Sequence, residues 1–154
     1  MSDAAVARSL TPTLRNSREL VIEWGDCDAA GIVFYPRYFQ MFDTSTGLLL
    51  QRATGMRKSA MLRHYAMVGI PMVDTRAKFH RPSTFGDPVR IDSRITAVHR
   101  SSFEVEHRLL HEGDVLAVEG FETRVWVGRH PDDPARIKAQ PIPEEVIARF
   151  AEAG

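Results

Sequence analysis

Apolar side chains are concentrated in residues 36–52, where they recur with the period of an α-helix. Four residues share the main face at spacings of three or four: Tyr38, Phe42, Ser45 and Leu49. Further apolar residues widen this stripe around most of the helix, which predicts a buried helix wrapped by a sheet. Pro36 suits the first turn, because the N–H that proline lacks has no partner inside a helix.

Alternation of apolar and polar residues dominates much of the remaining chain and is typical of strands with one buried face. Strands are predicted at residues 20–24, 73–80, 89–97, 103–109 and 115–127. A shorter helical or irregular segment is expected at 57–68, a hairpin turn at 112–114, a loop at 128–141 and a helix at 142–151. This order predicts an α+β protein, with one long central helix against a five-stranded antiparallel sheet.

Length and composition narrow the class of protein. A chain of 154 residues suits one domain, expected at 17–154 after a loose polar lead-in at 1–16. The formal net charge of +0 disfavours nucleic-acid binding and favours self-association. The single cysteine fits a reducing compartment. We find neither a signal-peptide pattern nor an apolar run that could cross a membrane, so a cytoplasmic protein without a membrane partner is expected.

The segment between the first strand and the long helix carries candidate chemistry, because Gly25, Asp26, Asp28 and Gly31 lie close together in it. Aspartates in loops often accept hydrogen bonds from backbone N–H groups, which is a structural interpretation. Alternatively, one carboxylate acts as nucleophile or general base in acyl transfer, with the oxyanion held by the N–H groups beside Pro36. Gly31 would allow backbone to approach a ligand closely. Both interpretations stay open on these residues alone.

Two other kinds of site are disfavoured here. Cys27 stands between two carboxylates, which oppose formation of the thiolate that a nucleophile needs. Two carboxylates without a histidine are too few for a metal site. His107 and His111 are four residues apart on a strand pattern, and His107 shares its side with Phe103 and Val105. We expect His107 to be a core or interface residue, and we expect no metal and no cofactor.

Asp43 is a separate candidate within the long helix. It shares a helix face with Phe39, Gly47 and Leu50. A carboxylate on an apolar helix should not be left unpaired. Its partner is either an arginine across a subunit interface or a polar group of a substrate, and the sequence leaves both open.

The motif at residues 25–38, GDCDAAGIVFYPRY, closely resembles that of the 4-hydroxybenzoyl-CoA thioesterase family of hotdog-fold enzymes. Weaker likeness continues through Gly69–Val73, Phe79, Asp87–Val89, Arg100–Phe103 and Pro143. The resemblance implies hydrolysis of acyl-CoA thioesters by dimers or tetramers, with active sites at the dimer interface. We expect a homotetramer.

The same resemblance assigns roles to individual residues. Asp28 corresponds to the catalytic carboxylate, the backbone N–H of Tyr35 would polarise the thioester carbonyl, and Gly31 belongs to this catalytic segment. Asp43 falls where the aryl-selective enzyme has an aspartate near the ring hydroxyl of its substrate. Pro36 stands where some related thioesterases carry a histidine, so the resemblance is to the aryl-CoA branch of the family. Pro36 is therefore, like Asp43, a candidate substrate-binding residue.

The family's basic cluster for the phosphates of CoA is thin in this chain. Its place is taken by Arg100, Ser101 and Ser102 after His99. Residues 57–81 hold six lysines and arginines, among which Lys78 and Arg81 are further candidates for CoA binding. A solvated strand face is the alternative interpretation of these charges.

The predicted function is therefore hydrolysis of an aromatic, hydroxybenzoyl-type acyl-CoA to free acid and CoA, with Asp28 as nucleophile or general base. A thioesterase for acyl carrier protein would share the chemistry but needs a basic docking surface. A non-catalytic acyl-CoA binding module would not need the carboxylate of Asp28.

Overall fold

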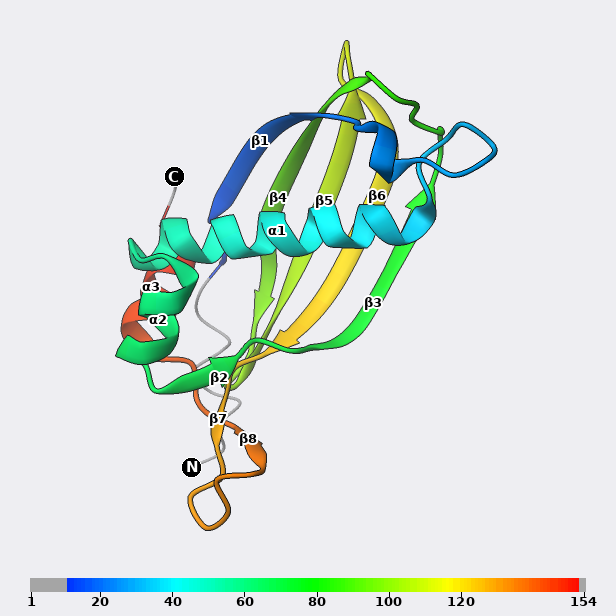
Figure 1. Cartoon of the computed structure of the whole chain (residues 1–154). Helices are drawn as coiled ribbons and strands as arrows, with labels where there is room; N and C mark the ends of the chain where they lie inside the picture. Colours follow the sequence, from blue (N-terminus) through cyan, green and yellow to red (C-terminus); the bar gives the residue numbers. More distant parts are fainter. Residues whose placement is uncertain (1–10, 153–154) are drawn as a thin grey trace.

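A five-stranded antiparallel sheet curves around one long helix in the computed structural model, which describes residues 11–152 (Figure 1). The strand order is β1-β4-β5-β6-β3, and α1 spans Tyr35–Thr54. The strands are β1 (Arg15–Val21), β3 (Met72–Phe79), β4 (Pro88–Val98), β5 (Ser102–His111) and β6 (Val115–Val125). The predicted α+β architecture is confirmed.

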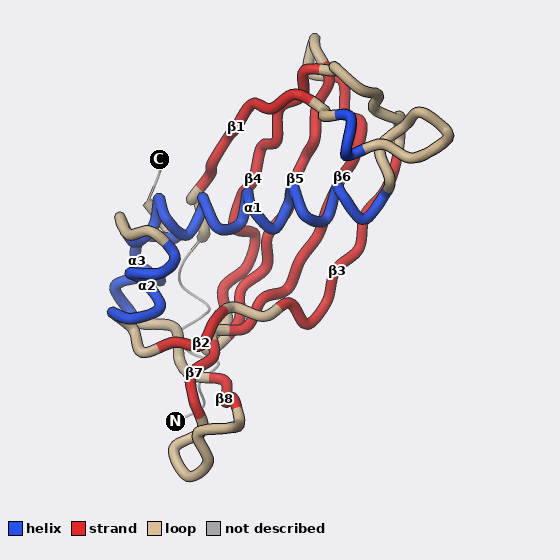
Figure 2. Tube along the Cα trace, viewed as in Figure 1, coloured by secondary structure: helices blue, strands red, loops and turns tan. Residues whose placement is uncertain are grey.

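A second, smaller sheet has the order β2-β7-β8 and lies beyond one end of the large sheet, beside two short helices (Figure 2). These elements are α2 (Lys58–His64), β2 (Met67–Gly69), β7 (Val127–Arg129), β8 (Ile137–Ala139) and α3 (Glu144–Phe150). The single strand expected at 115–127 is wrong, because the chain leaves the large sheet at Trp126. The N–H of Trp126 donates to the carbonyl of Ser101 at 2.7 Å, and its carbonyl accepts from Gln140 at 2.8 Å. The loop expected at 128–141 accordingly contains β8.

The position of the first strand also differs from the expectation. Residues 1–10 of the predicted lead-in lie outside the described part of the chain, but residues 13–16 are hydrogen-bonded to the rest of the fold. The N–H groups of Thr13 and Leu14 both donate to the carbonyl of Phe150, and Leu14 is buried. Strand β1 begins at Arg15, earlier than predicted, because its alternating side chains continue the register against β4.

Helix α1 buries one face rather than its whole circumference. Its buried residues are Tyr38, Met41, Phe42, Ser45, Thr46, Leu49, Leu50 and Ala53. Gln40, Asp43 and Gln51 are exposed, so the prediction of burial on all sides is wrong for the single chain. Phe42 of the helix packs directly on Gly120: a Cβ added at Gly120 would lie only 2.5 Å from the Phe42 ring. No helix within residues 11–152 is long and apolar enough to span a membrane.

Candidate active site

A tight hairpin connects η1, a short 3₁₀ helix at Trp24–Asp26, to the start of α1. The N–H of Asp28 donates to Ile32 at 3.0 Å, and the N–H of Gly31 donates to the carbonyl of Asp28 at 2.9 Å. Gly31 closes this turn at a φ of +80°, a conformation that favours glycine. Cys27 pairs with Val33 below the turn. In Figure 1 this hairpin projects beyond the sheet at the end where α1 begins.

Asp28 is the first residue of the turn, and its side chain is exposed in the single chain. Its Oδ1 accepts a hydrogen bond from the N–H of Ala30 at 2.8 Å. Asp26 similarly accepts from the N–H of Glu23 at 2.9 Å. The structural interpretation of both aspartates is therefore correct, yet it occupies one oxygen of Asp28 and leaves Oδ2 with no hydrogen-bond partner among residues 11–152.

The start of α1 offers an unpaired donor close to this turn in the chain. Phe34 is the N-cap, its N–H donates to Asp26, and the N–H of Arg37 donates back to Phe34. Tyr35 opens the helix, and its N–H makes no hydrogen bond to any described residue. Such N–H groups carry partial positive charge and point out of the helix end. A carboxylate oxygen and an N–H that both lack a partner in the described part of the chain thus belong to one short segment.

Several aromatic side chains of the hairpin and of neighbouring segments are exposed. Trp24 is 77% exposed and Phe85 is 60% exposed, although their rings contact each other edge to face. We call the aromatic patch the group Trp24, Phe34, Tyr35, Phe79 and Phe85. Exposed aromatic side chains such as these are typical of a place where another surface binds.

Asp43 lies two helical turns after Tyr35, about 12 Å along the axis. Its side chain is 54% exposed and pairs with Nη2 of Arg124 at 2.8 Å. Arg124 comes from β6 of the same chain, so the expected arginine partner exists but does not come from across a subunit interface.

Arg124 connects Asp43 to polar side chains that are buried in the core. Its Nε and Nη2 donate to the two carboxylate oxygens of Glu122, each at 3.1 Å. Glu122 also accepts from the hydroxyl of Thr46 at 2.6 Å and lies 3.3 Å from Nε2 of His107. Burial alone would raise the pKa of Glu122, but His107 and Arg124 outweigh it and lower that pKa to about 2. Glu122 is therefore ionised at neutral pH.

This buried network was missed from the sequence, apart from His107. His107 is fully buried, hydrogen-bonded to Ser93 at 2.6 Å and stacked on Phe42, so its predicted place in the core is confirmed. The two-residue period of the strand could have predicted the burial of Glu122 and Arg124, because it puts them on the same side as buried Val118.

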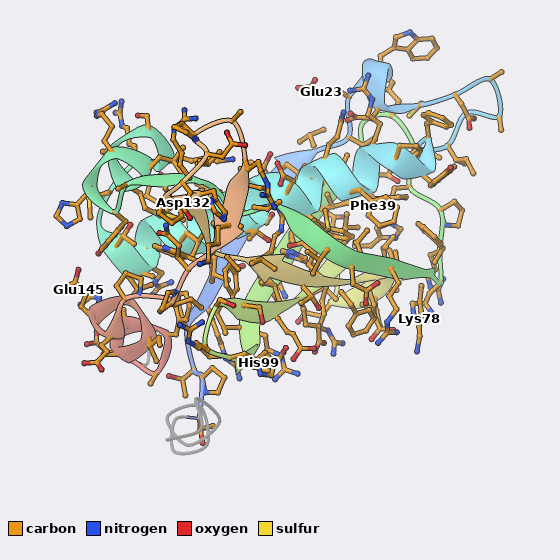
Figure 3. The ribbon with its side chains drawn as sticks, turned by 90° about the horizontal axis from the view of Figure 1, so that it is seen from below. Glu23, Phe39, Lys78, His99, Asp132 and Glu145 are labelled. Atoms are coloured by element: carbon orange, nitrogen blue, oxygen red, sulfur yellow. The ribbon has the colours of Figure 1, made fainter. Side chains whose placement is uncertain are left out.

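The candidate CoA-binding residues are not brought together within one chain. Ser101 and Ser102 lie at the β4–β5 turn, where Ser102 pairs with Val125, close to the point where β3 begins beside β6. Lys78 is six residues farther along β3, which is about 20 Å at ~3.3 Å per residue. Figure 3 shows Lys78 and His99, the neighbour of Arg100, at separate places on the sheet. Arg81 follows β3 at the same end as Lys78 and donates its N–H to Ala117.

Comparison with known proteins identifies the family. A sequence profile of the thioesterase-like superfamily matches residues 22–150. The chain belongs to this superfamily. It is 31% identical over 153 residues to the 4-hydroxybenzoyl-CoA thioesterase of Pseudomonas sp. (strain CBS-3), which covers 92% of this chain and 97% of the relative. The 1,4-dihydroxy-2-naphthoyl-CoA hydrolase of Synechococcus elongatus is 29% identical over 97 residues, 63% of this chain and 71% of the relative.

The fold of the chain is also similar to that of a solved thioesterase structure. An Asp-to-Asn mutant of 4-hydroxybenzoyl CoA thioesterase complexed with 4-hydroxybenzoyl CoA superposes with a TM-score of 0.81. The two proteins are 25% identical, over 91% of this chain and 100% of the other. The predicted hotdog fold and family are confirmed, and the protein is an enzyme that hydrolyses acyl-CoA thioesters.

Proposed function

We propose that this thioesterase hydrolyses an aromatic acyl-CoA that carries a ring hydroxyl, with Asp28 as the catalytic carboxylate. The observation that carries the proposal is that Asp28 and Tyr35 belong to one hairpin and helix start, where Oδ2 of Asp28 and the N–H of Tyr35 both lack a hydrogen-bond partner among the described residues. The N–H would accept the developing charge on the thioester oxygen, beside the turn closed by Gly31. The resemblance of residues 25–38 to the family motif, in which Asp28 corresponds to the catalytic carboxylate, supports the assignment.

Asp28 would act in one of two ways. As nucleophile, it attacks the thioester carbon, the C–S bond breaks, and a mixed anhydride and CoA thiolate result before water cleaves the anhydride. As general base, it takes a proton from water, whose oxygen then attacks the same carbon while CoA leaves. Both routes need a carboxylate at this position and a donor for the oxyanion.

Asp43 would select the acyl group. Its Oδ1 is held by Arg124, while its Oδ2 has no hydrogen-bond partner among the described residues, so it can accept from a ring hydroxyl. Pro36 lies two turns before it on the same helix and would border the same acyl site. Two of the curated relatives act on hydroxylated aromatic acyl-CoAs, of one and two rings. We propose that Arg100, Ser101 and Ser102, or Lys78 and Arg81, contact CoA.

A panel of thioesters tests the substrate class. We expect kcat/KM for 4-hydroxybenzoyl-CoA to exceed that for benzoyl-CoA by about tenfold or more, since leaving a charged acceptor without its donor costs roughly 1–3 kcal/mol. The matched control is 4-methoxybenzoyl-CoA, which fills similar space but cannot donate. Equal rates for all three esters, or preference for a straight-chain ester, would refute the proposed substrate class.

A second copy of the chain would complete the site. Asp28 is exposed in one chain, whereas an attack on a thioester is favoured where water is displaced. The aromatic patch lies around the hairpin and would be covered by a homo-oligomer built from dimers. In such a homo-oligomer, one group of CoA-binding candidates would come from each chain, so the two groups need not lie close together within one chain.

The oligomer is tested by light scattering. The wild type is expected to have the mass of two or four chains, and the double variant Trp24→Glu/Phe85→Glu to dissociate, because it places two charges in the aromatic patch. Ile137→Glu is the control, since Ile137 is also exposed but belongs to β8 of the second sheet. A monomeric wild type, or equal masses for wild type and double variant, would contradict the interface.

A further inference from the structure

The carboxylate of Asp43 is held by a guanidinium whose own orientation is fixed from several sides. Arg124 is 5% exposed and donates to both oxygens of Glu122, to the carbonyl of Ile70 at 3.3 Å and to Asp43 at 2.8 Å. A two-point contact between guanidinium and carboxylate fixes the plane of both groups. Arg124 therefore meets Asp43 from one direction.

Glu122 is fixed in turn by groups of two other elements, α1 and β5. Thr46 of α1 donates to its Oε2, and His107 of β5 lies against the same oxygen. His107 is held by the hydroxyl of Ser93 on β4, and all buried polar side-chain atoms of the described residues have hydrogen-bond partners. The network thus joins α1 to β4, β5 and β6, and rotation of Arg124 would leave buried groups unpaired.

The charges leave Asp43 a strong acceptor. One guanidinium serves two carboxylates, and Glu122 takes two of its hydrogen bonds while Asp43 takes one. Asp43 is consequently oriented without being fully neutralised. The side chain of Asp43 is 54% exposed, so it is accessible to a substrate or a second copy that packs on α1.

We propose that Arg124 is a positioning residue for acyl-group selectivity, which acts through Asp43 and is itself held by Glu122. This inference rests on the proposed function, in which Asp43 accepts a hydrogen bond from the ring hydroxyl. Arg124 does not touch the acyl group. It holds Oδ1 of Asp43 so that Oδ2 is presented at one place on the helix.

The test is the ratio of kcat/KM for 4-hydroxybenzoyl-CoA to that for benzoyl-CoA in Arg124→Lys. Lysine keeps the positive charge beside Glu122, but one ammonium cannot reproduce the planar fork that contacts both carboxylates. We expect the ratio to fall about tenfold, with no further fall when Arg124→Lys is added to Asp43→Asn. A merely structural role would lower both rates together and leave the ratio unchanged. Arg108→Lys, on the exposed face of β5, is the matched control.

A second variant keeps the test decisive if Arg124→Lys does not fold. Glu122→Gln/Arg124→Gln removes the buried carboxylate and the buried guanidinium together, so that neither is left in the core without the other, and its ratio is expected to fall equally. A wild type without preference for the hydroxyl would overturn the proposed substrate class and this inference with it. A preference that is lost in Asp43→Asn but kept in both Arg124 variants would overturn this inference alone.

Discussion

Replacing Asp28 by asparagine is expected to lower kcat by about a thousandfold while the turn and the fold remain intact. The amide oxygen of asparagine can still accept the hydrogen bond that Asp28 receives from Ala30. The NH2 group then replaces the free oxygen, and it can neither attack a carbonyl nor remove a proton from water. General-base or nucleophilic groups commonly contribute about 10²–10⁴-fold to rate.

Asp26→Asn is the matched control for this experiment. Asp26 also accepts one backbone hydrogen bond, from Glu23, and lies two residues away, so the variant makes the same chemical change in the same segment. We expect its kcat to stay within about threefold of the wild type. Single-turnover kinetics measure the chemical step, and binding of the acyl-CoA to Asp28→Asn by calorimetry should change little. If Asp28→Asn turned over like the wild type, or Asp26→Asn lost as much, the catalytic role of Asp28 would be wrong.

Periodicity predicted the large elements of this fold because each has one face against a common core. Residues 36–52 and the alternating segment 103–109 lie within α1 and β5, respectively. The short strands β7 and β8 were not predicted, because three residues are too few to show a period and their pairing is set by tertiary contacts. The exposed half of α1 was also misjudged, since an apolar composition predicts burial without saying whether the same chain supplies the cover.

The candidate site divides in the same way between local and long-range features. Asp28, Gly31 and Tyr35 are neighbours in the sequence, so one motif places them on one hairpin and helix start. Arg124 is 81 residues from Asp43 in the sequence, and only the packing of α1 on β6 brings them together. Charged residues within a strand are usually expected to face solvent, so the burial of Glu122 was not predicted.

Removal of the buried charge of Glu122 has the largest expected effect on stability. Glu122 is 4% exposed, and Glu122→Gln would leave the guanidinium of Arg124 facing a neutral amide in the core. Breaking a buried ion pair by removing one partner costs about 3–5 kcal/mol. We expect the free energy of unfolding, measured by urea denaturation at fixed protein concentration near pH 7, to fall by about 3 kcal/mol.

Glu119→Gln is the control from the same strand, because Glu119 lies on the opposite side of β6 and pairs with the exposed His80. An exposed ion pair contributes about 0–1 kcal/mol, so this variant should unfold much like the wild type. A loss in Glu119→Gln equal to that in Glu122→Gln would show that the effect comes from removing any charge of β6 rather than from the buried network.

The pH dependence gives a second, independent test of the Glu122 network. The pKa of Glu122 is lowered from its usual 4.5 to about 2 in the folded protein, so the carboxylate stabilises the fold fully above about pH 4.5. This contribution, about 3 kcal/mol for such a lowering, is lost as the pH falls from 4.5 through 2. The wild type should therefore lose stability over this range, and Glu122→Gln should lose less of it, so that the two unfolding free energies converge on acidification. A constant difference between them from pH 7 to pH 3 would mean that the carboxylate of Glu122 is not held ionised by Arg124 and His107.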